Sequence, residues 1–233
     1  MNQETTTQIA TTPMAIIQEN ITQNMQVQEA VKVNPAIIPI LSANGIDYCC
    51  GGATNLAEAI EAQNIDAPTF IASLNRMEKQ ERGTIEDALH MNPEELVRYI
   101  VDVHHRRELE WIDEIDRNLA KLLNVHYASH GDELADIYRR FVNLKLELIP
   151  HFAQEEHTDF PEFLATGKVD FAQLRAEHEE AGAMLDALER DTDDFTAPAD
   201  ACATYQYTYR LLRDLAADIH QHIFLENSVL FEM

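Results

Sequence analysis

The apolar residues of this 233-residue chain recur mainly at helical spacing. In the C-terminal two thirds, four segments repeat them every three to four positions, which predicts four long amphipathic helices. Polar breaks near residues 129–132 and 192–198 separate the segments, and Phe160-Pro161 is expected to end the second helix. Four such helices with short connections predict an all-α, up-down four-helix bundle. The predicted helices span residues 93–125, 134–159, 170–190 and 199–231.

A smaller helical module is predicted before the bundle. Asn34-Pro35 is typical of a helix start, Gly45 of a helix end, and Asn55 or Thr54 of the next cap. The predicted divisions are a polar, mostly disordered tail, the small helical domain, a linker and the bundle, with an extra helix over residues 15–25 as the alternative to disorder in the tail. These divisions cover residues 1–26, 27–81, 82–91 and 92–233.

The charge and the cysteines narrow the setting of the protein. Seventeen basic and 41 acidic side chains give a net charge of −24, which disfavours nucleic acid and anionic lipid as partners. No apolar run is long enough to span a membrane, and the polar N-terminus lacks the order of a signal peptide. Three cysteines, two of them adjacent, do not form a secreted disulfide framework. A cytoplasmic location is expected.

Histidines and glutamates interrupt the apolar stripes in a regular way. Each predicted bundle helix carries one histidine on its stripe, and two of these histidines have a glutamate four residues later on the same face. Burying imidazoles and carboxylates is costly unless they share a partner such as a metal ion. Imidazole and carboxylate suit iron, manganese or zinc, and a carboxylate can bridge two ions. The predicted metal ligands are His104, His151, Glu155, His178, His222 and Glu226.

Chance is the alternative explanation, because ten histidines in a glutamate-rich chain produce some pairs at this spacing. His104 and Glu108 form one such pair; Glu108 is expected to be solvated or to support a ligand, with a third carboxylate ligand as the alternative. A histidine on every helix favours a metal site over metal-free histidines. No glutamate precedes a histidine by three residues, so the ferritin-like ligand pattern is absent. Oxygen-carrying hemerythrins have a fifth histidine where this chain has Gly182, which leaves an open coordination position.

From Val27 to Phe231 the chain resembles the repair of iron centres (RIC) family of hemerythrin-like di-iron proteins. The resemblance rests on Asp-Tyr-Cys-Cys-Gly-Gly at residues 47–52, His-x3-Glu-Glu at 151–156, Glu-His-Glu-Glu-Ala-Gly at 177–182 and His-x3-Glu-Asn at 222–227. It implies two non-haem irons, oxo-bridged, held by four histidines and two bridging glutamates. It also implies a role in mending iron-sulfur clusters after nitrosative or oxidative damage. The chain departs from the family in its long polar N-terminal tail and in ending at Glu232-Met233 without the usual proline.

Several further residues are candidates for supporting roles. Cys49 and Cys50 lie between turn-forming residues and are candidates for redox chemistry or iron transfer, with packing of the module as the alternative. Glu147 and Glu177 are candidates for supporting the metal ligands or lining an iron path, with plain surface charge as the alternative. Cys202 is expected to be buried as a small apolar residue. The histidines expected to be solvated are His105, His126, His130, His157 and His220.

Two functions of different classes fit the sequence. In the leading hypothesis, the protein supports repair of damaged iron-sulfur proteins, either by supplying iron or by removing nitric oxide or peroxide. Whether the di-iron centre is a nitric oxide or peroxide reductase stays open. In the alternative, the protein is a module that binds or senses oxygen or nitric oxide without turnover. Damaged iron-sulfur proteins are the expected transient partners, and a homodimer through the N-terminal domain is a further expectation.

Overall fold

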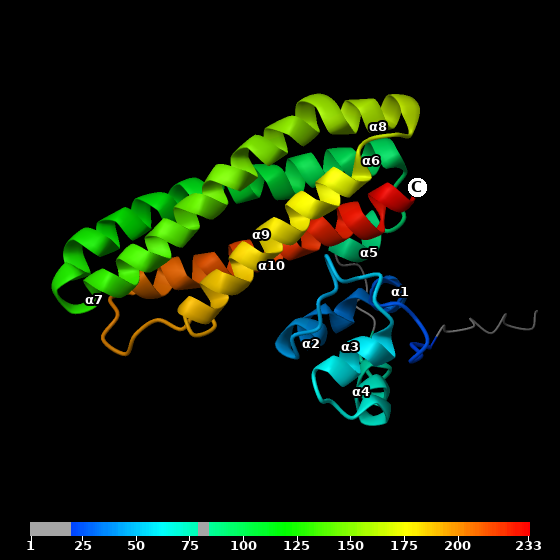
Figure 1. Cartoon of the computed structure of the whole chain (residues 1–233), viewed down its shortest axis with the longest axis horizontal. Helices are drawn as coiled ribbons and strands as arrows, with labels where there is room; N and C mark the ends of the chain where they lie inside the picture. The colour runs from blue at the N-terminus through cyan, green and yellow to red at the C-terminus, as the bar shows by residue number, and fades with distance from the viewer. Residues whose placement is uncertain (1–19, 79–83) are drawn as a thin grey trace, which may run out of the picture.

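The computed structural model describes residues 20–78 and 84–233, and every regular element over these residues is helical. Figure 1 shows a long bundle with a small helical module against one side of it. The predicted all-α fold, a four-helix bundle preceded by a small helical module, is confirmed. The bundle consists of α6 (Pro93–Tyr99), a π-helical turn (Ile100–His105), α7 (Arg106–Gln154), a second π-helical turn (Glu155–Asp159), α8 (Phe160–Thr166), α9 (Phe171–Asp191) and α10 (Ala203–Ser228).

Helix α7 turns back on itself and supplies two of the four bundle helices (Figure 1). The turn is at His130, whose φ of −134° and ψ of 22° are not helical, within the predicted polar break. His105 and Glu155 lie 25 residues before and after this turn (130 − 105 and 155 − 130). At 1.5 Å per residue, both lie about 37 Å from the turn. The hairpin therefore brings these two residues to the same level, at the end of the bundle far from the turn.

The two π-helical turns change which residues face the core. A π turn connects residues five apart in place of four, so it rotates the following residues relative to a regular helix. Ile100 is fully buried, and regular helical spacing from it would bring His104 to the same face. Across the π turn the corresponding residue is instead His105. Regular helical spacing counted from Ile100 therefore selects His104, whereas the π turn brings His105 to the position facing the core.

Three predicted boundaries differ from the structure. Phe160-Pro161 does not end the second bundle helix, because the π turn directly before it, in which the Phe160 N–H bonds to Glu155 O, already replaces the regular i to i−4 pattern. The helix ends instead at Gly167, whose φ is +68°. The predicted linker at residues 82–91 contains α5 (Thr84–Ala88), which buries Ile85 and Ala88, although residues 79–83 lie outside the described part. The last helix begins at Ala203 and not at residue 199.

The small module consists of short capped helices. Asn34 and Asn55 accept hydrogen bonds from backbone N–H groups at two helix starts, and Gly45 adopts a positive φ of 65° after α2. Ile21 is 3% exposed and exchanges two backbone hydrogen bonds with the Asn75 side chain, so packing begins before residue 27. Residues 1–19 of the predicted tail lie outside the described part. The helices are α1 (Val27–Val33), a 3-10 turn (Pro35–Ile37), α2 (Ile38–Ala43), α3 (Leu56–Ala62) and α4 (Ala67–Leu74).

The module contacts the bundle through its cysteine loop. The Asn227 side chain at the end of α10 donates to the backbone oxygen of Cys49, and Tyr48 packs against Phe224 with ring centroids 6.0 Å apart. Within the described residues, none of the helices combines the length and the apolar character that crossing a bilayer requires. The fold thus places the Cys-Cys loop beside the bundle helix that carries His222 and Glu226.

Candidate metal centre

A group of fully buried polar side chains lies inside the bundle, with Glu226 of α10 at its centre. Its carboxylate Oε1 lies 3.0 Å from His222 Nε2, and its Oε2 lies 3.0 Å from His178 Nε2. Glu226 is 0% exposed, and the two histidines are exposed by at most 2%. Each oxygen of this carboxylate therefore faces a different imidazole.

Glu155 mirrors this arrangement from the other side of the group. Its Oε1 lies 3.2 Å from His151 Nε2, and its Oε2 lies 3.5 Å from His105 Nε2. The six side chains make up two sets of four potential ligands, and both glutamates belong to both sets. One set is His105, His222, Glu155 and Glu226, and the other is His151, His178, Glu155 and Glu226.

The outward-facing nitrogen of each of these four imidazoles has a hydrogen-bond partner. An acceptor at Nδ1 holds the proton there and leaves the Nε2 lone pair free to bind a metal. The same tautomer is thus favoured at all four rings. The pairs are His105 with Glu156 at 2.9 Å, His151 with Glu177 at 2.9 Å, His178 with Asn227 at 2.9 Å, and His222 with Glu108 at 3.2 Å.

Burial and neighbouring charges shift the pKa values of these side chains in opposite directions. Burial lowers the pKa of His178, but Glu155 and Glu226 outweigh it and raise that pKa to about 10. Burial lowers the pKa of His105 to about 3, assisted by His222. Burial raises the pKa of Glu226, yet His222 and His178 hold it well below its usual range. Buried carboxylates therefore require positive charge here, from protons on imidazoles or from bound cations.

The residues present fit a pair of metal ions. Within the described residues, neither oxygen of Glu155 has a hydrogen-bond partner of good geometry, although both are fully buried. Unsatisfied buried carboxylate oxygens are strongly unfavourable unless another group binds them. Imidazole nitrogens with bridging carboxylate oxygens are a donor set that suits iron, manganese or zinc. Aromatic rings seal the site, with Phe152 stacked on His105 at 4.5 Å and Phe231 on His178 at 6.2 Å.

The structure differs from the sequence prediction at the first helix of the bundle. His105 was predicted to be solvated; this is wrong, because it is 0% exposed and lies 3.1 Å from His222 Nε2. His104, predicted as a ligand of this centre, is not part of either set of four. The π turn at Ile100–His105 rotates His105 to the core face, as described above. Counting back one heptad from buried Ile112 also gives residue 105, so the sequence contained this signal.

Four further residues in or next to the site were missed or underrated from the sequence. Glu156, Asn227 and Glu108 accept from histidines of the two sets, and Glu108 is fully buried, not solvated. Burial raises the pKa of Glu108 against the opposing effect of His222. The fourth residue, Asp218, lies next to the site and not in it, with its Oδ2 3.1 Å from His104 Nδ1. No periodic pattern identifies such partners, because they are defined by contacts between helices.

The two glutamates predicted to support the ligands lie at the mouth of a cavity next to His151. Glu177 is half-buried and its Oε2 accepts from His151 Nδ1. Glu147 is exposed and lines the same cavity, together with Glu180. The His151 side chain is 11% exposed, more than those of the other three histidines in the group. Solvent therefore comes closest to the site on this acidic side.

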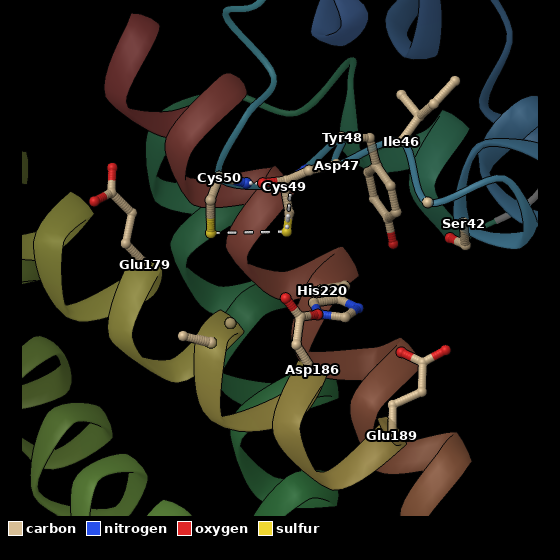
Figure 2. Close-up of a pocket in the computed structure, with 13 residues that line it drawn as sticks. Ser42, Ile46, Asp47, Tyr48, Cys49, Cys50, Glu179, Asp186, Glu189 and His220 are labelled. Atoms are coloured by element: carbon tan, nitrogen blue, oxygen red, sulfur yellow. Dashed lines mark hydrogen bonds between the residues drawn. The ribbon is translucent and has the colours of Figure 1, made fainter. Parts of the chain in front are cut away.

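The Cys-Cys loop forms the roof of a separate pocket between the module and the bundle (Figure 2). Asp47 holds the loop by accepting hydrogen bonds from the backbone N–H groups of Cys49, Cys50 and Gly51. The two sulfur atoms lie 3.8 Å apart, and Cys50 Sγ lies 3.5 Å from the backbone oxygen of His178. A hydrogen bond with Cys50, together with burial, raises the pKa of the Cys49 thiol well above its usual value.

The remaining cysteine and histidines lie away from the centre. Cys202 was predicted to be buried; this is wrong, because it precedes α10 at an exposed position, with its Sγ 3.4 Å from His126 Nε2. His157 is exposed as predicted, whereas His220 is half-buried and lines the pocket beneath the cysteines, near Asp186 (Figure 2). The others, His126 and His130, are half-buried near the turn of the bundle.

Comparison with known proteins agrees with this geometry. Residues 96–233 match the family described as "Hemerythrin HHE cation binding domain", and residues 23–78 match a domain of unknown function, DUF542. The iron-sulfur cluster repair protein ScdA of Staphylococcus epidermidis is 30% identical over 223 residues, covering 91% of this chain and 98% of that protein. The iron-sulfur cluster repair protein YtfE of Escherichia coli O157:H7 is 31% identical over 193 residues, covering 80% and 85%.

The first prediction separates the two adjacent histidines. We expect His105→Ala to lower the number of metal ions bound per chain by one, because it removes a nitrogen from one of the two sets of four potential ligands. His104→Ala should leave the iron content and the absorption spectrum of the centre unchanged. The measurement is iron per folded chain, by elemental analysis together with the optical spectrum. The reverse pattern would return His104 to the centre in place of His105.

The second prediction concerns a bridging carboxylate. Glu226→Gln keeps the size of the side chain but replaces one bridging oxygen by an amide nitrogen that cannot bind a metal. We expect at least one iron to bind about 10–100-fold more weakly, a loss comparable to other perturbations of metal sites. Glu232→Gln, which changes an exposed carboxylate near the end of the same chain, is the control. Equal iron affinity in both variants would remove Glu226 from the site.

Proposed function

The chain belongs to the family of hemerythrin HHE cation-binding domains, with iron-sulfur cluster repair proteins among its relatives, and on this basis we propose its function. We propose a di-iron protein that supports the repair of iron-sulfur clusters damaged by nitric oxide or oxidants. It does so by supplying iron or by removing the damaging species. The metal ligands proposed are His105, His151, Glu155, His178, His222 and Glu226.

A single observation carries this proposal, namely the way that two carboxylates are shared. Glu155 and Glu226 each direct their two oxygens to histidines of two different sets. One metal ion would use a single oxygen of each carboxylate and leave the others buried without partners, which is unfavourable. Two ions use all four oxygens. The family resemblance adds iron as the metal and an oxo bridge between the two ions.

Bound iron would supply a redox-active Lewis acid with an open coordination position for a small ligand. Residues of the chain leave that position free and surround it. Gly182 offers no side chain at the place where oxygen-carrying hemerythrins have a fifth histidine, and a Cβ there would meet only Cys50 Sγ, at 3.5 Å. Phe152 and Phe231 exclude water from the faces of two ligand rings. An additional open position, compared with the oxygen carriers, favours reaction over reversible oxygen carriage.

The acidic mouth beside His151 is the proposed route for iron. Glu147, Glu177 and Glu180 line this cavity, and Glu177 contacts a metal-binding histidine directly. Carboxylates attract a divalent cation and bind it through oxygen without enclosing it fully. An iron ion that leaves the centre on the His151 side would therefore pass these carboxylates on its way to solvent. This arrangement supports iron donation as one arm of the repair function.

The cysteine loop is proposed to act in iron or electron transfer to the damaged protein. The Cys49 thiol is held in its protonated form, and Asp47 is occupied by backbone N–H groups. The Cys49 proton must leave before this thiol can bind iron, so a short-lived contact with iron fits the loop better than a permanently bound ion. The loop also touches the metal centre, because Asn227 bonds to both Cys49 O and His178 Nδ1.

Repair of a damaged enzyme tests the proposed function. An iron-sulfur dehydratase inactivated by nitric oxide is incubated with the iron-loaded protein, and recovery of its activity is measured over time. We expect recovery with the loaded wild-type protein and none with His178→Ala, which lacks a metal ligand. Recovery that is equal with both proteins would contradict a role for the centre. Nitric oxide consumption by the reduced protein, measured in parallel, separates removal of the damaging species from iron supply.

A further prediction concerns the vicinal thiols. Replacing Cys49 and Cys50 by serine should leave both irons bound, because the proposed ligands are all elsewhere, but should slow repair of the damaged enzyme. Cys202→Ser, which changes an exposed cysteine beyond the loop, is the matched control and should repair normally. Full repair by the double variant would reduce the pair to a packing role. Loss of iron from the double variant would place the thiols in the metal centre.

A further inference from the structure

A second buried cluster of metal-binding side chains lies next to the proposed di-iron centre. It consists of His104, Glu108 and Asp218, with one potential ligand atom from each within 4.8 Å of the others. The three side chains are exposed by 3%, 0% and 8%. None of them belongs to the two ligand sets of the di-iron centre. The cluster lies between the first bundle helix and α10.

The geometry of this cluster resembles that of the di-iron centre itself. His104 Nδ1 lies 3.1 Å from Asp218 Oδ2, within the range of 3.0–3.7 Å between histidine and glutamate atoms of the di-iron centre. Two ligands about 2.1 Å from a common metal, at angles near those of a tetrahedron or octahedron, lie about 3.0–3.4 Å apart. The ligand atoms of His104 and Asp218 are therefore spaced to hold a common ion, and an oxygen of Glu108 lies within 4.8 Å of both.

Hydrogen bonding within the cluster is incomplete. His104 approaches Asp218 through Nδ1, so its buried Nε2, which has no hydrogen-bond partner within the described residues, is not one of the ligand atoms of this cluster. The two oxygens of Glu108 lie 3.3 and 3.2 Å from the same atom, His222 Nδ1, which has one proton to donate. At least one oxygen of Glu108 is thus left without a proton from that ring. Buried polar atoms in this condition are rare and point to a missing partner.

The positive charge near the two carboxylates is also limited. Arg107 Nη1 donates to Asp218 Oδ1 at 2.9 Å, but its side chain is 40% exposed, so solvent weakens its effect. It leaves the second oxygen of Asp218 facing His104. One histidine and two carboxylates suit iron, manganese or zinc. A divalent cation between these three side chains would balance the negative charges of Glu108 and Asp218 and would be coordinated by all three residues.

We propose that His104, Glu108 and Asp218 form a third metal site, for one divalent first-row ion such as Fe²⁺ or Mn²⁺. Glu108 connects the two sites, because it would bind the third ion while accepting from His222 of the di-iron centre. The third ion therefore lies one side chain away from the pair.

The test uses the iron-loaded full-length protein and Mn²⁺ as the probe. Mn²⁺ is titrated in excess Mg²⁺, which occupies the many exposed carboxylates, and free Mn²⁺ is followed by its electron paramagnetic resonance signal. We expect one Mn²⁺ to bind per chain while both irons remain. His104→Ala and Asp218→Asn should each weaken this binding by at least about 100-fold. Both variants should keep the iron content and optical spectrum of the wild type.

The matched control is His130→Ala, which removes another histidine-aspartate contact, at 3.0 Å from Asp200, near the turn of the bundle. It should bind Mn²⁺ as the wild type does. Mn²⁺ binding that is equal in wild type, His104→Ala and Asp218→Asn would overturn the proposal. If either variant fails to fold, pulsed resonance on the wild type decides. Nitrogen coupling from one histidine supports the site, and Mn²⁺ without nitrogen coupling refutes it.

Discussion

The burial of two glutamates inside an apolar bundle is the constraint on which the rest of the structure depends. Glu155 and Glu226 are both 0% exposed, and an uncompensated buried charge costs on the order of several kcal/mol. Four imidazoles surround the carboxylates, and every imidazole is itself held by an outer acceptor. The negative charges of the two carboxylates can be buried only if protons or metal ions between the side chains compensate them. The proposed di-iron site follows from this requirement.

The same requirement explains how the outer parts of the chain relate to the centre. Asn227 accepts from His178 and donates to the loop of Cys49, so one amide orients a ligand and anchors the small module. Glu108 accepts from His222 and adjoins the cluster of His104 and Asp218. The centre is therefore coupled by single side chains to a thiol loop on one side and to a second cluster on the other.

Regular helical periodicity was sufficient to predict the bundle and most of the residues that converge in it. His151 and Glu155, like His222 and Glu226, are four residues apart on one helix, and such spacing can be read directly. Counting forward from Ile100 misses His105, because the π turn between them shifts the register by one residue, whereas counting back one heptad from Ile112 finds it. Glu156, Asn227 and Asp218 contact residues on other helices, and a single sequence does not contain those distances. Cys202 was misjudged because it lies at a helix start, beyond the apolar stripe.

X-ray absorption at the iron edge of the loaded protein tests the central claim most directly. Shared carboxylates require two irons in one site, so the account predicts two irons per chain and a scattering contribution from a second iron within about 4 Å of the first. The light-atom shell should be made of nitrogen and oxygen without sulfur, because the proposed ligands are imidazoles and carboxylates. A spectrum of isolated iron, with no iron neighbour in protein that carries its full metal content, would contradict the account.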